Sequence, residues 1–246
     1  MKIASRAASS HVILTLAAAL ALTGCHKSDD AFGKRVHAYL LEHPEVIREA
    51  AEKLREKDQI AEAKASSDTL AKYRNQLEHD PRDFVANPDG KITVVEFFDY
   101  RCGYCKLAAP QVLQLIKDHP DVRFVFKEFP IFGDLSDTAA RIALTPQVKA
   151  KGLEIYKGWM AEKALTDASL DSHLKDLGID AEAARKSATD PAIQRQLTDT
   201  RSLAAALKLE GTPAFIVGDT LVPGADMNAV RAAITVAKAG KLKTIS

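Results

Sequence analysis

Two of the three cysteines of this chain lie three positions apart, in the segment RCGYCK at residues 101–106. Cys102 and Cys105 are separated only by Gly103 and Tyr104. This spacing suits a disulfide that opens and closes during a reaction, half of a metal site, or two unrelated small side chains. The chemistry therefore depends on the elements that position the pair and on the other ligands that the chain offers.

The surrounding residues predict that the cysteine pair joins a strand to a helix. The run ITVVEFF at residues 92–98 is rich in β-branched and aromatic side chains and predicts a strand buried on both faces. Apolar residues at helical spacing follow at residues 106–117. Cys102 would then lie at a helix N-terminus, where the macrodipole and free backbone N–H groups stabilise a thiolate. We expect Cys102 to be the nucleophile and Cys105, one turn later, to attack the resulting mixed disulfide.

A metal site at the cysteine pair would need two further ligands. The chain has no second cysteine pair, and the nearest histidines in sequence, His79 and His119, form no ligand spacing with the cysteines. We therefore expect no metal here. The position of the pair at a strand-to-helix junction also argues against two unrelated cysteines.

The pattern that follows predicts an α/β fold. Residues 121–129 are a second strand, so strand, helix and strand form a βαβ unit whose two strands are parallel. Residues 214–222 predict a two-stranded hairpin, and residues 226–239 a closing helix.

The long stretch between these strands is helical in pattern. It covers residues 136–209, and Ser136, Thr166 and Asp190 are residue types that favour the N-cap of a helix. We expect a helical subdomain between the second strand and the hairpin.

Residues 26–80 have a different composition, with 10 Lys or Arg and 12 Asp or Glu among 55 residues. Pro44 suits the first turn of a long helix, whose apolar residues become sparse towards Leu70 and Leu77. A helix with so narrow an apolar stripe can bury little against its own domain. Two interpretations stay open: a solvated stalk, or a helix that pairs with its copies in a homo-oligomer through residues 32–78.

The first 24 residues are typical of an export signal. Lys2 and Arg6 precede an uncharged apolar run at residues 12–22, which is too short to span a membrane. The run ends in LTGC, which resembles the bacterial lipobox, whose cysteine, here Cys25, becomes the lipid-linked first residue. An ordinary secretory signal is the alternative. His26 stands where an aspartate would favour the inner membrane, so we expect a periplasmic protein anchored by lipid, with the outer membrane preferred.

Charge excludes one class of partner. Loss of residues 1–24 removes two positive charges and no acid, so the formal net charge changes from +1 to −1. A nearly neutral chain with 6% aromatic residues gives no reason to expect nucleic acid as a partner.

The cysteine count excludes a structural disulfide framework. If Cys25 carries lipid, Cys102 and Cys105 are the only free thiols of the chain.

Several segments together resemble the DsbA-like thiol:disulfide oxidoreductases of the thioredoxin superfamily. They are VEFFDYRCGYCK, Pro110 in the helix that follows it, KEFPIFG before the helical stretch, and GTPAF at residues 211–215. The likeness covers about residues 32–240. It is greatest to the ScsC-type branch, which carries an extra N-terminal helical segment.

The resemblance implies a thioredoxin-like α/β fold with an inserted helical subdomain. The signal peptide would be residues 1–24, the helical stalk or oligomerisation segment residues 25–80, and the DsbA-like domain residues 81–246. The helical insertion would cover about residues 136–208.

The resemblance also implies roles for individual residues. Glu96, six residues before Cys102, matches the buried acid that exchanges protons beneath the cysteines. Thr212 and Pro213 match the loop whose proline is cis, with Thr212 contacting an extended substrate strand and Pro213 shielding the cysteines. No cofactor is implied, and the partners would be unfolded or misfolded exported proteins and a membrane redox partner.

Three residues depart from the strong oxidases of the family, which typically carry Pro-His between the cysteines and Val before the cis-proline. Gly103, Tyr104 and Thr212 are more like the periplasmic isomerases and reductases. We therefore predict a pKa for Cys102 below that of a free thiol but above that of the most oxidising members.

The sequence thus predicts an exported enzyme that forms or reshuffles disulfides through a mixed disulfide at Cys102. The alternative is a binding module or chaperone with the same fold, in which the two thiols hold copper as soft-metal ligands.

Overall fold

The computed structural model describes residues 25–245, with side chains described for residues 30–240. The expected signal peptide and the side chain of Cys25 lie outside the described residues. The chain divides into two compact units between Glu62 and Ala63.

The first unit contains α2 (Cys25–Glu42) and the beginning of α3 (Glu45–Glu78). Pro44 immediately precedes α3, as the sequence predicted, because its fixed φ suits a helix start. Within the described residues, no helix has both the length and the apolar character that crossing a membrane requires.

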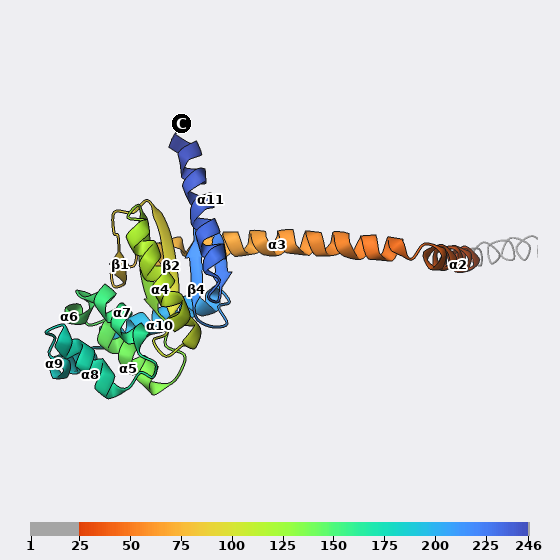
Figure 1. The fold of residues 1–246 in the computed structure, drawn as a ribbon. Helices are drawn as coiled ribbons and strands as arrows, with labels where there is room; N and C mark the ends of the chain where they lie inside the picture. The colour runs from red at the N-terminus through yellow and green to blue at the C-terminus, as the bar shows by residue number, and fades with distance from the viewer. Residues whose placement is uncertain (1–24, 246) are drawn as a thin grey trace, which may run out of the picture. The chain divides into compact units, whose positions relative to one another are not determined.

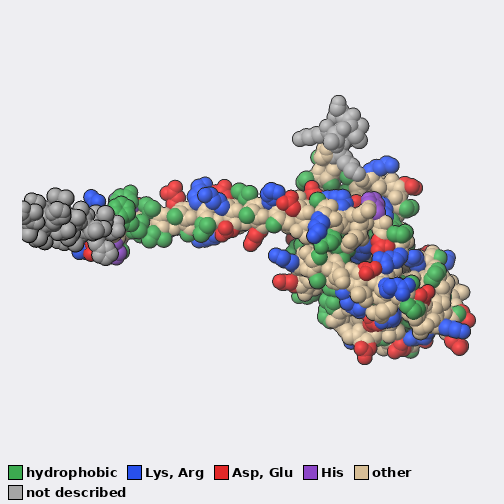
Figure 2. Space-filling view, turned by 180° about the vertical axis from the view of Figure 1, so that it is seen from behind, with side chains coloured by type: hydrophobic (Ala, Val, Ile, Leu, Met, Phe, Trp, Pro, Cys, Tyr) green, Lys and Arg blue, Asp and Glu red, His purple; other side chains and the backbone are tan. Residues whose placement is uncertain are grey.

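The helices of the first unit are strongly charged and exposed. Lys or Arg and Asp or Glu side chains are interspersed along α3 (Figure 2), and Lys53 pairs with Glu56 at 2.9 Å. Leu54 is 60% exposed and Ile47 is 57% exposed. This part of α3 therefore buries little of its own apolar surface, as expected from its narrow stripe.

The last turns of α3 belong to the second unit and differ from this expectation. Leu70 and Leu77 are each only 2% exposed and pack in one cluster with Val95, Phe97 and Val125 of the sheet. The prediction that the helix buries little was wrong here, because two leucines seven residues apart lie on the same side of the helix and both meet the sheet.

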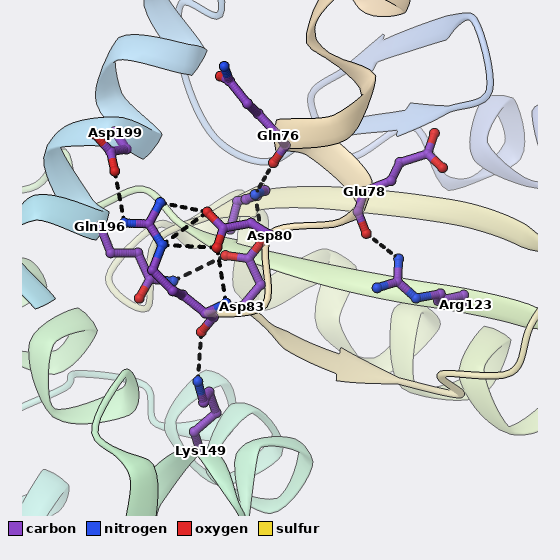
Figure 3. Close-up of polar contacts among 10 residues, drawn as sticks. Gln76, Glu78, Asp80, Asp83, Arg123, Lys149, Gln196 and Asp199 are labelled. Atoms are coloured by element: carbon purple, nitrogen blue, oxygen red, sulfur yellow. Dashed lines mark hydrogen bonds and ion pairs between the residues drawn. The ribbon is translucent and has the colours of Figure 1, made fainter. Parts of the chain in front are cut away.

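Polar contacts also fasten the end of α3 (Figure 3). The Lys127 ammonium forms an ion pair with the carboxylate of Asp83 and donates a hydrogen bond to the backbone carbonyl of Gln76, and both side chains of the pair are buried. Arg82, in the turn after the helix, pairs with Asp199 at 2.8 Å. These contacts fix the path by which the chain leaves α3 and enters the sheet.

The second unit is built on a five-stranded sheet of order β1-β3-β2-β4-β5 (Figure 1). The strands are β1 (Phe84–Ala86), β2 (Ile92–Phe98), β3 (Val122–Glu128), β4 (Ala214–Val217) and β5 (Thr220–Pro223). β2 and β3 are parallel and the other neighbours are antiparallel, which confirms the predicted βαβ unit and hairpin. The sequence did not predict β1, since three residues are too few to show a strand period.

Helices cover both faces of this sheet. Even-numbered core residues of β2 and β3 pack with α4 (Gly103–Asp118) and α11 (Met227–Ile245). Odd-numbered residues, such as Val95 and Val125, pack with the end of α3 and with α10 (Pro191–Ala206). This alternation places Glu96 on the α4 face.

The predicted helical insertion lies between β3 and β4. Its helices are α5 (Asp134–Ala143), α6 (Pro146–Lys149), α7 (Gly152–Ala161), α8 (Asp167–Asp176), α9 (Ala181–Ser187) and α10. Thr166 and Asp190 cap α8 and α10, as predicted. Ser136 does not cap a helix, because α5 begins two residues earlier and the Ser136 hydroxyl donates to Asp99.

Candidate redox site

Cys102 is the N-cap of α4, with an extended backbone (φ −69°, ψ 120°). Its sulfur accepts a hydrogen bond from the Cys105 backbone N–H at 3.4 Å. Its thiol donates to the backbone carbonyl of Thr212 at 3.1 Å. Both cysteines are free thiols, and they are 2% and 0% exposed. The predicted position of Cys102 at the start of the helix is confirmed.

The two thiols have opposite acidities. A hydrogen bond from the Cys105 side chain is the largest influence on Cys102 and, with backbone N–H groups of Cys105 and Tyr104, lowers the pKa of Cys102 to about 6 against the effect of burial. Burial raises the pKa of Cys105 far above that of a free thiol, and the hydrogen bond to Cys102 raises it further. Cys102 is therefore the thiolate near neutral pH and Cys105 the thiol.

The Thr212–Pro213 peptide bond is cis, as the resemblance implied. Thr212 is 9% exposed and its hydroxyl is buried, and its side chain is one of the groups that lower the pKa of Cys102. The Pro213 carbonyl accepts from the Gly224 backbone N–H at 2.8 Å. This loop lies beside Cys102, because the Thr212 carbonyl accepts the hydrogen bond from the Cys102 thiol.

Glu96 lies on β2 and is 1% exposed, so the acid is buried, as the resemblance implied. The Tyr156 hydroxyl lies 3.0 and 3.1 Å from its two carboxylate oxygens. Burial raises the pKa of Glu96 to about 8, the Tyr156 hydrogen bond opposes that rise, and the charge of Cys102 adds to it. A carboxyl group with a pKa near neutral can both accept and supply protons.

Tyr156 was missed from the sequence. It belongs to α7 of the helical insertion, where its spacing is that of an ordinary core residue. Only the fold, which packs α7 against α4, brings its hydroxyl to Glu96.

Asp99 is a second residue that the sequence analysis missed. It is 2% exposed and accepts hydrogen bonds from the backbone N–H groups of Arg101 (2.7 Å), Ile131 (2.8 Å) and Phe132 (3.1 Å), and from the Ser136 hydroxyl (2.8 Å). Asp99 therefore joins the loop before Cys102 to the loop after β3. The sequence did contain a sign of this role, because Asp99 is a charged residue between a buried strand and the cysteine pair.

The rim of the site is apolar. Tyr104 and Leu107 are 67% and 68% exposed, and Ile131 and Phe132, held by Asp99, are 41% and 45% exposed. Gly103 is exposed, and a Cβ atom added there would meet no atom of another part of the chain within 4 Å. Such a rim suits contact with apolar peptide side chains.

Among the described residues, no group of three or more His, Cys, Asp or Glu side chains is arranged to hold a metal ion.

Two family models match the chain. The model described as a DSBA-like thioredoxin domain matches residues 93–234, more than half of the chain. The model described as the N-terminal domain of the copper resistance protein ScsC matches residues 30–61.

Several solved structures are similar to this chain. A thioredoxin-like oxidoreductase from Silicibacter pomeroyi DSS-3 is 34% identical, with 67% of this chain and 97% of that chain covered and a TM-score of 0.64. BcfH from Salmonella enterica Typhimurium is 33% identical, with 86% and 96% covered and a TM-score of 0.68. The catalytic domain of Proteus mirabilis ScsC is 26% identical, with 70% and 98% covered and a TM-score of 0.64.

Among curated proteins, the chain is similar to part of the Na(+)/H(+) antiporter NhaA 1 of Salinispora arenicola, at 29% identity over 164 residues. It spans about a quarter of the length of the curated relatives that it matches.

Proposed function

Because the chain belongs to the DsbA-like thioredoxin domain family, with an N-terminal segment of the ScsC type, we propose that it is an exported thiol:disulfide oxidoreductase. It would form or reshuffle disulfides in extracytoplasmic proteins. The observation that carries this proposal is the position of Cys102, a low-pKa thiol at a helix N-terminus beside the Thr212–Pro213 loop.

The reaction would proceed by thiol–disulfide exchange. In the reducing direction, the Cys102 thiolate attacks a substrate disulfide, forms a mixed disulfide and releases one substrate sulfur as a thiolate. Cys105 then loses its proton and attacks the Cys102 sulfur, which releases the second substrate sulfur with two electrons transferred to the substrate. In the oxidising direction the same steps run backwards, and Cys105 leaves as a thiolate that must be protonated.

Glu96 would exchange that proton. The raised pKa of Cys105 makes its thiolate costly, so a nearby group has to take or supply the proton as the sulfur reacts. Burial is the largest cause of the raised pKa of both Glu96 and Cys105, and the charges of other groups in the site raise both further.

Thr212 and Pro213 would bind the substrate chain. The Thr212 carbonyl already accepts a hydrogen bond from Cys102, and an extended peptide alongside this loop would place its sulfur next to the Cys102 sulfur. Tyr104, Leu107 and Phe132 are exposed on the rim and would contact apolar side chains of an unfolded or misfolded protein.

Isomerisation is the direction that we favour. Gly103 and Tyr104 between the cysteines and Thr212 before the cis-proline resemble the isomerases and reductases, and a homo-oligomer formed through residues 32–78 would bring several sites together. The match of residues 30–61 to the ScsC N-terminal domain supports a separate role for that segment.

The location that we propose is the periplasm, with the chain attached to a membrane, preferably the outer one, by lipid on Cys25. This rests on the signal-like residues 1–24 and the lipobox-like LTGC. A membrane redox partner would return the cysteine pair to its working state.

The test uses the mature chain from Cys25 with a dithiol peptide and with scrambled ribonuclease. We expect wild type to oxidise the peptide or restore the ribonuclease, Cys102→Ser to do neither, and Cys105→Ser to accumulate the mixed disulfide. A wild-type protein that does neither but binds Cu(I) tightly would instead support the copper-binding module, in which Cys102 and Cys105 are soft ligands.

A further inference from the structure

A second buried carboxyl group lies near the redox site and has no part in the exchange described above. Glu128, at the end of β3, is 7% exposed. Its Oε1 accepts a hydrogen bond from the Tyr100 hydroxyl at 2.9 Å. Its Oε2 is buried and has no hydrogen-bond partner among the described residues. A buried polar atom of this kind usually meets an ordered water or serves the chemistry.

Glu128 lies on the same face of the sheet as Glu96. In the parallel pairing of β2 with β3, Glu96 is opposite Phe126 and Phe98 is opposite Glu128. Because side chains alternate along a strand, both glutamates point towards the helices that cover the cysteines. The two carboxyl groups are therefore diagonal neighbours on adjacent strands.

A small cavity lies beside Glu128 and Tyr156. It is lined by Glu128, Tyr100 and Tyr156 and otherwise by apolar residues such as Phe98 and Phe126. About 10 Å³ is available to the centre of a water molecule, and roughly that volume is needed for a single water. Tyr156, which lines this cavity, donates its hydroxyl to Glu96, and Glu128, which also lines it, has a buried oxygen with no hydrogen-bond partner among the described residues.

We propose that Glu128 is a second proton-holding carboxyl group of the redox site, connected to Glu96 through the Tyr156 hydroxyl and one water molecule in this cavity. The proposal rests on the proposed function of the cysteine pair. When Cys105 gives up its proton to the ionised form of Glu96, Glu96 passes one to the Tyr156 oxygen, Tyr156 passes its own to the water, and the water passes one to Glu128 in its ionised form. Tyr156 and the water are unchanged overall, and one proton has moved from Cys105 to Glu128.

The reverse transfer supplies a proton when Cys105 leaves as a thiolate. The electrons stay with the sulfur atoms in both directions, so the relay changes only where the proton is held. By taking or giving this proton, Glu128 returns Glu96 to the protonation state that the next thiol–disulfide exchange needs.

The groups that face Glu128 fit this role. Burial raises the pKa of Glu128 well above its ordinary value, the Tyr100 hydrogen bond opposes the rise, and Asp99, Asp83 and Glu96 add to it. Both glutamates therefore keep a proton more readily than exposed carboxyl groups do.

The first experiment needs no enzymatic activity. In the reduced mature chain with ¹³C-labelled glutamate carboxyl groups, the Glu96 resonance is followed by NMR against pH. We expect Glu128→Gln to remove one step from the Glu96 titration, because Glu96 then no longer senses the ionisation of Glu128, while the step caused by Cys102 remains. The amide introduced by this substitution keeps an oxygen that accepts from Tyr100. Identical Glu96 titration curves in both proteins would overturn the proposal.

The second experiment measures the rate at which Cys105 resolves a preformed mixed disulfide. We expect Glu128→Gln to slow this step roughly tenfold, less than the roughly 10²–10⁴-fold effect of a group that takes the proton directly, and to change its pH profile. Tyr156→Phe should lose a similar factor, and the double variant should lose no more than the larger single loss. Additive losses would contradict a shared path.

Glu154→Gln is the matched control, since Glu154 is exposed on the same helix as Tyr156. It should leave the titration and the rate unchanged. If wild type shows the step that depends on Glu128 but exchanges no thiols, the proposed function fails and the coupled pair of carboxyl groups stands. If thiols exchange but the Glu96 titration does not depend on Glu128, only the relay fails.

Discussion

The Cys102 thiol donates a hydrogen bond of 3.1 Å to the backbone carbonyl of Thr212, which follows it by 110 residues in the chain. The contact depends on the antiparallel pairing of β2 with β4, in which Glu96 is opposite Phe215 and Phe97 is opposite Ala214. This register places the residue before the cis-proline beside the first residue of the cysteine pair. The two halves of the site are therefore aligned by the sheet.

Alkylation of the reduced protein at different pH values should give a midpoint near pH 6 for Cys102, since hydrogen bonding lowers its pKa to about 6. The Cys105 side chain is the largest cause, so Cys105→Ala should move the midpoint up by about one pH unit or more. Cys105→Ser keeps a side-chain donor and should stay closer to wild type. Equal midpoints in the two variants would show that this side chain does not set the pKa.

Glu96→Gln should change how stability depends on pH. The pKa of Glu96 is raised from 4.5 to about 8, so between these values the unfolded chain releases a proton that the folded chain keeps. The stability of wild type therefore falls as the pH rises through this window, while the variant has no carboxyl group to ionise. Across this pH window, the free energy of unfolding of the variant should rise relative to that of wild type by a few kcal/mol, since each unit of pKa shift corresponds to about 1.4 kcal/mol.

Urea unfolding of the reduced proteins, followed by the fluorescence of the single tryptophan, measures this difference. Trp159 is fully buried, so its emission reports the folded core. A difference between the proteins that is constant from pH 4 to pH 8.5 would contradict a raised pKa for Glu96.

The contrast between Glu96 and Tyr156 shows what the sequence could predict. Glu96 stands out because a lone acid interrupts an apolar strand next to the cysteine pair, and the strand, the helix after it and the hairpin follow from local patterns. Tyr156 cannot be found this way, because its contact joins residues 60 positions apart and its own helix shows only core spacing. The sequence showed Leu70 and Leu77 as apolar residues of the helix but did not predict their burial, because a sparse stripe does not reveal that a sheet lies beneath it.

Asp99→Ala should destabilise the protein and weaken catalysis. It removes the acceptor of four hydrogen bonds, including those from Ile131 and Phe132, so partly buried N–H groups lose their partner, at a cost of up to about 1–3 kcal/mol each where water cannot replace it. Ser136→Ala is the control, because it removes one donor and should cost only about 1 kcal/mol. Urea unfolding and the KM for a dithiol peptide test this, and equal costs for the two variants would show that Asp99 does not hold the loops.

Thr212→Val should raise the pKa of Cys102 with little loss of stability. The Thr212 side chain is one of the groups that lower this pKa, so a methyl group in place of its hydroxyl removes a contact that favours the thiolate. The hydroxyl is buried, and its replacement should change the free energy of unfolding by no more than about 1 kcal/mol. Valine stands at this position in the strong oxidases of the family, from which this sequence departs. Alkylation against pH and the rate of oxidation of a dithiol peptide measure the change, and an unchanged midpoint and rate would contradict a tuning role.

Leu77→Ala should cost far more stability than Leu54→Ala, although both residues lie in α3. Leu77 is 2% exposed and packs on the sheet of the second unit, so its truncation should cost about 2–5 kcal/mol. Leu54 is 60% exposed in the first unit, so its truncation should cost less than about 0.5 kcal/mol. Urea unfolding of the mature chain at one fixed protein concentration measures both, because any self-association would make stability depend on concentration. Equal costs would mean that the end of α3 is not part of the folded core.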